Sequence, residues 1–77
     1  MPHVTIKHFP KDFADEQKWQ LAEAITRVVT EHFGTYDGAV SIALEPVPAH
    51  DWTERVYEPE IVGRQQSLIK EPNYRNN

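Results

Sequence analysis

The sequence predicts an α/β (α+β) fold built on one βαβ unit. Residues 3–9 and 40–45 each alternate apolar and polar side chains, which is the period of a strand covered on one face. Between them, residues 15–33 place apolar side chains three or four positions apart, as an amphipathic helix does. The two strands should therefore be parallel and joined by a right-handed crossover.

Composition excludes several classes of function. The chain has 77 residues and no cysteine, which excludes disulfides, thiolate metal sites and thiol nucleophiles. Its formal charge of −4 disfavours nucleic acid and anionic membranes as partners. No apolar run reaches the roughly 18 residues of a membrane span, and no signal peptide is evident at the N-terminus. We therefore expect a single small domain in the cytoplasm.

Particular residues set the boundaries of the first strand and the central helix. Val4 and Ile6 share one face of the strand, and Pro10 ends it. Residues 12–15 supply carboxylates that can accept hydrogen bonds from the first helical N–H groups, although the pattern does not select one of them as the cap. Gly34 is placed to end the helix in a left-handed conformation.

The second strand is followed by a turn. Pro46 and Pro48 stop the strand, because proline has no N–H group to donate to a neighbouring strand. Asp51 could then cap a short turn around Trp52.

A second helix is predicted near the C-terminus. Pro59 is placed at its first position and the helix continues to about Lys70, although Gly63 weakens the pattern. Residues 71–77 are polar and are expected to form a loose tail unless Tyr74 docks on a partner.

The size of the chain and its single βαβ unit predict an oligomer. Such a unit has a helix on only one face of its sheet, so the other face needs cover. A chain of this length also buries only about 60% of the surface of its unfolded state. We therefore predict an obligate oligomer in which the sheets of at least two chains join or stack.

Several features together resemble a known family. They are Met1-Pro2 before an alternating strand, Asp15-Glu16-Gln17-Lys18 at the start of the helix, the strand at residues 40–44, and His50-Asp51-Trp52 after it. This combination resembles the 4-oxalocrotonate tautomerase family over residues 2–55, and the longer C-terminal part is similar to the phenylpyruvate tautomerase branch. The resemblance implies one tautomerase-like domain over residues 1–77, with a core at 2–55 and a helical extension at 56–77.

The resemblance also implies a chemistry. Family members carry out keto–enol tautomerisation of 2-keto acids, here arylpyruvates such as phenylpyruvate, without a metal or an organic cofactor. Their base is the mature N-terminal proline, which is Pro2 once Met1 is removed. An α-amino group has a reference pKa of about 7.7–8.0, and apolar surroundings or a nearby cation lower it. A fraction of the amine is then neutral at pH 7 and can act as a general base.

Substrate-binding candidates follow from the same resemblance. Typical members place one arginine after the first strand, another in the second strand and an aromatic wall beyond it, and these positions fall near Lys11, on Ser41 and on Trp52. Lys11 and Ser41 both depart from the arginines of the pattern, which argues against the dicarboxylate substrate of the name-giving enzyme and leaves open which cation binds the substrate carboxylate. Lys11 and Arg55 are the candidates, and His50 beside Trp52 is a further candidate for the pocket.

Two alternatives to this function stay open. One is a non-catalytic βαβ oligomerisation module that lost the arginine of the second strand. The other is a related enzyme that hydrates or dehalogenates unsaturated acids with the same proline. For the assembly we predict a homodimer rather than a hexamer, because residues beyond about Tyr57 extend the chain relative to the short hexameric members and could block the stacking of dimers.

Overall fold

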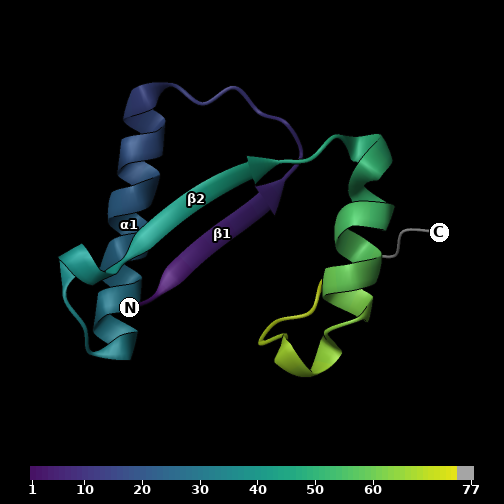
Figure 1. The fold of residues 1–77 in the computed structure, drawn as a ribbon. Helices are drawn as coiled ribbons and strands as arrows, with labels where there is room; N and C mark the ends of the chain where they lie inside the picture. The colour runs from purple at the N-terminus through teal and green to yellow at the C-terminus, as the bar shows by residue number, and fades with distance from the viewer. Residues whose placement is uncertain (75–77) are drawn as a thin grey trace. The chain divides into compact units, whose positions relative to one another are not determined.

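The computed structural model describes residues 1–74, and the last three residues of the predicted polar tail lie outside this part. Three regular elements follow one another in the order β1 (His3–His8), α1 (Asp15–Phe33) and β2 (Ser41–Pro46). The chain divides into two compact units. The first consists of Met1–Ile6 and Lys11–Glu45, and the second of Lys7–Pro10 and the chain from Pro46 onward. Figure 1 follows the chain through its elements.

The two strands pair directly, side by side (Figure 1). The Ser41 N–H donates to the Pro2 carbonyl at 3.1 Å, and the Val47 N–H donates to the His8 carbonyl at 2.8 Å. Both bonds have the same offset along the chain, so the strands run parallel with a constant register. The predicted βαβ unit is therefore confirmed. The register also places Ser41 next to the first residues of the chain.

Helix α1 has the predicted bounds, but its N-terminal cap differs from the prediction. Residue 14 is an alanine, which has no side-chain oxygen, and the cap is made in the reverse direction: the Ala14 N–H donates to Gln17 Oε1 at 2.9 Å. Asp15 and Glu16 lie in the first turn, where carboxylates suit the positive end of the helix dipole. At the other end Gly34 has the predicted left-handed conformation, with φ of 63°.

One face of the first unit's strands lies against α1 and the other is open. Leu21 and Ala22 of α1 border one hollow together with Ile42 and Leu44 of β2. The opposite face of the sheet carries His3, Thr5 and Ser41, which are exposed in the single chain. The apolar side chains of both strands therefore face α1, as the alternation predicts.

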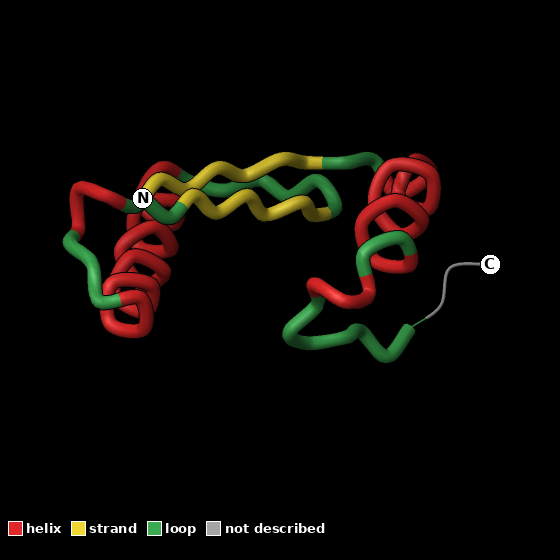
Figure 2. Tube along the Cα trace, turned by 60° about the horizontal axis from the view of Figure 1, so that its bottom comes forward, coloured by secondary structure: helices red, strands yellow, loops and turns green. Residues whose placement is uncertain are grey.

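The second helix is shifted toward the N-terminus from its predicted position. It spans Thr53–Val62 (η3), with π-type hydrogen bonding, and the short turn Ala49–Asp51 leads into it. Figure 2 shows this helix as the coil after the second strand. Pro59, the predicted first residue, lies inside the helix, and no side chain caps its start, so the predicted cap at Asp51 was also wrong.

The residue at the end of this helix, Gly63, must be a glycine for a steric reason. Its N–H donates to the Glu58 carbonyl at 2.9 Å. A Cβ atom at this position would lie 2.7 Å from the Pro59 carbonyl oxygen and 3.1 Å from that of Glu58. These are backbone atoms that cannot move independently, so only a residue without a Cβ atom fits at this position. The helix ends here instead of continuing to Lys70 as predicted.

Gly63→Ala is therefore expected to destabilise the protein. Relief of the two close contacts requires the end of the helix to shift, at a cost of roughly 1–3 kcal/mol. For a domain of this size the melting temperature should fall by about 4–8 °C per kcal/mol, measured by circular dichroism at fixed protein concentration. Gly38→Ala is the control, because a Cβ there meets only the Tyr36 ring, at 3.4 Å. Equal melting temperatures for the two variants would contradict the steric explanation.

The core of the single chain is small. Within residues 1–74, the side chains classed as buried are those of Ala39, Val47 and Val56. Several large apolar residues stay exposed, among them Trp19 and Phe33 on α1. None of the helices in this part of the chain is long and apolar enough to cross a membrane.

Candidate active site at the N-terminal proline

Pro2 lies directly before β1 and lines a cavity of about 390 Å³. The cavity is bordered by the first four residues of the chain and by Val29 and Phe33 from the last turns of α1. Pro2 itself is half-buried, and its carbonyl is fixed by the N–H of Ser41. The position of the Pro2 ring is thus set by the pairing of β1 with β2, and its surroundings are mainly apolar.

Three hydrogen-bonded polar side chains lie at the same end of the sheet. His3 Nδ1 lies 2.6 Å from Ser41 Oγ, and His3 Nε2 lies 3.2 Å from Thr5 Oγ1. Because a hydroxyl group both donates and accepts, either neutral tautomer of the imidazole can make both bonds. His3 is among the residues that border the Pro2 cavity, but its side chain lies on the sheet face opposite α1, whereas Val29 and Phe33 line the cavity from the α1 side. The serine in place of the expected arginine is therefore a partner of a histidine next to the candidate base.

Lys11, the first predicted cation, is remote from Pro2 within one chain. Its Nζ lies 4.9 Å from the centre of the Phe13 ring, just before the N-terminal end of α1. The Pro2 cavity is at the C-terminal end of the same helix. A 19-residue helix is about 28 Å long at 1.5 Å per residue. Lys11 can therefore approach a Pro2 nitrogen only if that nitrogen belongs to another chain.

The other two polar candidates lie together in the second unit. Arg55 Nη1 is 3.8 Å from one oxygen of Asp51, and His50 Nε2 is 3.5 Å from the other. Both side chains are largely exposed, so these ion pairs are expected to contribute little to stability. The carboxylate of Asp51 nevertheless contacts both predicted binding residues.

Trp52 belongs to an aromatic group in the second unit. Its ring meets that of Phe9 edge to face at 5.1 Å between centres, and its Nε1–H donates to the Tyr74 hydroxyl at 3.1 Å. Tyr74 in turn packs at 5.9 Å from Tyr57. The sequence predicted a loose tail unless Tyr74 docked on a partner, and Tyr74 instead packs on its own chain. This group fixes the orientation of the tryptophan and ties the C-terminal segment to the helix Thr53–Val62.

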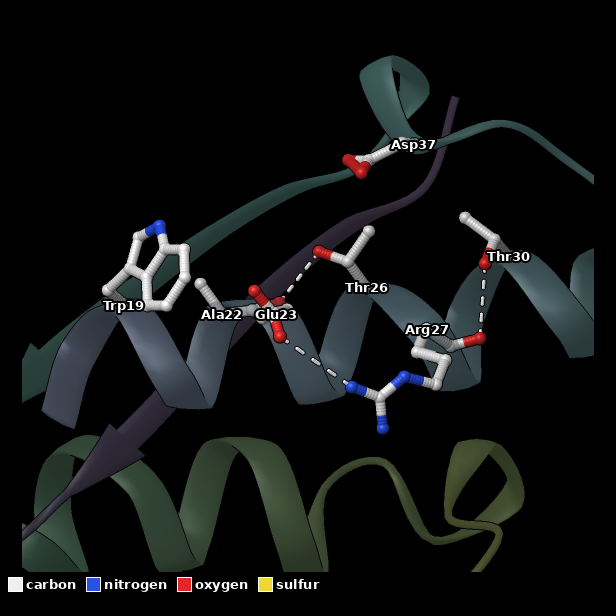
Figure 3. Close-up of a pocket in the computed structure, with 7 residues that line it drawn as sticks. All are labelled: Trp19, Ala22, Glu23, Thr26, Arg27, Thr30 and Asp37. Carbon is white, nitrogen blue, oxygen red and sulfur yellow. Dashed lines mark hydrogen bonds and ion pairs between the residues drawn. The ribbon is translucent and has the colours of Figure 1, made fainter. Parts of the chain in front are cut away.

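A larger hollow of about 700 Å³ runs along α1, as shown in Figure 3. Its polar side chains bond within the helix: Thr26 Oγ1 donates to the Ala22 carbonyl at 2.7 Å, and Arg27 pairs with Glu23 at 3.8 Å. These bonds hold the polar side chains of α1 to their own helix, and the carboxylate of Asp37 also lines the hollow. Although this hollow is larger than the cavity at Pro2, it is the weaker candidate for a catalytic site.

Sequence reasoning missed the pairing of His3 with Ser41. The sequence pattern assigned no role to His3, and Ser41 was considered only as the position of a missing arginine. The signal was present in the predicted parallel pairing, because parallel strands bring the starts of both strands to the same end of the sheet. The exact partner depends on the register, which alternation alone does not specify.

Comparisons with known proteins identify the family. A family model described as tautomerase enzyme matches residues 2–55. A protein named tautomerase PptA from Enterobacter sp. (strain 638) is 47% identical over 96% of this chain and 97% of its own length. The tautomerase PptA of Klebsiella pneumoniae (strain 342) is 45% identical with the same coverage. That of Escherichia coli (strain K12 / DH10B) is 38% identical over 100% of this chain and 99% of its own. The chain therefore belongs to the tautomerase family of enzymes, the isomerases that interconvert keto and enol forms.

Proposed function

We propose that this tautomerase converts the enol of an arylpyruvate to its keto form, with the mature N-terminal Pro2 as the base. The observation that supports this most is the position of Pro2 in an apolar-lined cavity at the end of a paired strand. Apolar surroundings disfavour the charged amine and so keep part of it neutral near pH 7. A general base works best when its pKa lies close to the working pH.

The proposed reaction needs only proton transfers. The neutral nitrogen of Pro2 accepts the proton of the enol hydroxyl, and the resulting ammonium delivers a proton to carbon 3 of the substrate. The C2–C3 double bond becomes a single bond and the C2–O bond becomes a carbonyl. The amine returns to its neutral form, so no oxidant, reductant or cofactor is consumed. A hydrogen-bond donor near the oxygen would stabilise the enolate that forms in between.

We propose further binding roles from the same resemblance. Trp52 serves as the apolar wall for an aryl group, and its fixed ring, with the Nε1–H on Tyr74, suits stacking. Arg55 and His50, held on Asp51, and Lys11 are the proposed contacts for the substrate's polar groups. The distance of Lys11 from the Pro2 cavity of its own chain makes this lysine a contribution from a second copy.

The proposed assembly is a cytoplasmic homodimer. Membership of the tautomerase family suggests a small-molecule substrate and an oligomer. The small core of the single chain and the exposed Trp19 and Phe33 support association. The residues after β2, which form a helix and a turn, support the smaller assembly, because this segment extends the chain beyond the family core. Elution from gel filtration at the mass of six chains would overturn the dimer.

One experiment tests the proposed function. The mass of the purified protein is measured and the same sample is assayed for ketonisation of phenylpyruvate enol. We expect the mass to lack Met1 and the enol to disappear faster than in buffer alone, because only the processed chain has a free Pro2 amine. A processed protein that is inert toward several 2-keto acids would instead favour a non-catalytic oligomerisation module. Turnover only of halogenated or unsaturated acids would favour the hydratase or dehalogenase.

A further inference from the structure

We propose that Phe33 selects aryl substrates in the Pro2 cavity, because its ring stacks on the aryl group of the enol. This inference rests on the proposed function of Pro2 and assigns a specificity residue to the same site. Val29 and Phe33 line the cavity from the last turns of α1, and within the described residues Phe33 is the one aromatic residue of its lining. Trp52 belongs to the other compact unit, so Phe33 is the aromatic residue that the first unit itself provides at this cavity.

Phe33 is the last residue of α1, and its side chain is open to solvent. Val29 and Phe33 are four residues apart, so they lie on the same face of the helix, one turn from each other. The chain leaves the helix at Gly34, where φ is 63° and an added Cβ atom would meet nothing within 4 Å. Phe33 is 73% exposed although it continues the apolar stripe of the helix. The space beside its ring is therefore accessible to a ligand in the cavity.

The ring of Phe33 is not occupied by another aromatic side chain. The ring pairs Phe9–Trp52 and Tyr57–Tyr74 lie in the other unit, and within the described residues Phe33 packs on no aromatic ring. Aromatic rings prefer offset-stacked or edge-to-face contacts, which add to the effect of burying apolar area. An aryl group in the cavity thus gains a contact with Phe33 that an alkyl group of the same size does not.

The proposed reaction requires the aryl group to lie in the same cavity as the base. In the enol of an arylpyruvate the aryl group is bonded to carbon 3, the atom that receives the proton from Pro2. One single bond separates the ring from the reacting carbon, so the aromatic contact must come from a residue at the cavity of the base. The volume of about 390 Å³ lies within the range of roughly 300–1,000 Å³ for small-molecule sites, and removal of Met1, which borders the cavity, leaves additional room.

The test compares two substrates that differ in the aromaticity of one ring. For the enol of phenylpyruvate, Phe33→Leu should raise KM about three- to tenfold, the loss expected for one ring contact, and should change kcat by less than about twofold. For the enol of 3-cyclohexylpyruvate, whose saturated ring has a similar size, KM should change by less than about twofold. Phe33→Tyr keeps the ring and should keep the wild-type KM for both. Tyr36→Leu is the matched control, because Tyr36 is exposed but lies outside the cavity lining.

A binding measurement separates this inference from the proposed function. 3-Phenylpropionate and 3-cyclohexylpropionate have no enol, and calorimetry on the processed protein gives their dissociation constants. In Phe33→Leu the dissociation constant should rise about three- to tenfold for the phenyl compound and less than about twofold for the cyclohexyl compound. This result supports the contact even where the wild type shows no turnover, in which case only the role of Pro2 as the base fails.

Other outcomes overturn the inference. An active wild type with unchanged KM and unchanged dissociation constants in Phe33→Leu leaves Pro2 as the base and removes Phe33 from the site. Equal losses with the phenyl and cyclohexyl compounds also overturn it, and a lower mass in gel filtration at the same time would assign Phe33 to a contact between two copies. A wild type that neither turns over the phenylpyruvate enol nor binds 3-phenylpropionate overturns both this inference and the proposed function.

Discussion

Pro2→Ala is expected to lower kcat/KM for enol ketonisation by roughly 10²-fold or more, since a positioned general base contributes about 10²–10⁴ in rate. Alanine at this position keeps an N-terminal amine, so some activity can remain. That amine is primary and can rotate, whereas the proline nitrogen is held in its ring. The ring also lies in the apolar cavity formed with Val29 and Phe33. The loss should appear mainly in kcat, because the base acts in the transition state.

The matched control for this variant is Pro10→Ala. Pro10 is also a proline next to β1, but it follows the other end of the strand and is exposed. Its replacement should leave kcat/KM within about twofold of the wild type, and mass spectrometry must show that all three proteins have lost Met1. Comparable activity for Pro2→Ala and wild type would show that the nitrogen of proline is not required.

Local patterns predicted the first unit of the chain well. Helix α1 has an apolar stripe and a glycine after its last turn, and both signals are contained in the sequence of the helix itself. Both strands alternate, and proline marks their ends. The cap was mispredicted because Gln17 supplies the oxygen from inside the helix, so the carboxylates before it were not needed.

The C-terminal helix shows what a local pattern cannot give. Pro59 favours the first position of a helix in isolation, and this preference placed the predicted start too late. The helix instead begins at Thr53, after the turn at Ala49–Asp51, and ends where Gly63 passes over two backbone carbonyls. That end depends on a close approach in three dimensions, which composition does not reveal.

In the candidate site, too, some features follow from the local sequence and others depend on how the elements and chains come together. Pro2 is predicted from its place at the start of an alternating strand together with the family resemblance, and its role stays a prediction. The contact of His3 with Ser41 depends on the strand register. Whether Lys11 can contact a substrate at Pro2 depends on which chain that Pro2 belongs to. Side chains of different elements come together through tertiary and quaternary structure, so a single sequence specifies them only weakly.

Val47→Asp is expected to remove much of the stability of the fold. Val47 has no exposed surface, and its N–H donates to the His8 carbonyl just beyond the end of β2. An uncompensated buried charge costs roughly 3–5 kcal/mol, against a total stability of about 5–15 kcal/mol for a typical domain. The melting temperature, measured by circular dichroism at fixed concentration, should fall by roughly 12 °C or more.

Burial also predicts how this loss should depend on pH. Desolvation raises the pKa of a buried carboxyl above its unfolded value, so the penalty is largest at neutral pH and shrinks as the carboxyl becomes protonated in both states. The gap between Val47→Asp and wild type should therefore narrow as the pH is lowered toward 4. Ile69→Asp is the control, because Ile69 is fully exposed and an aspartate there stays in solvent. If both variants melt within about 2 °C of wild type, residue 47 is not part of the folded core.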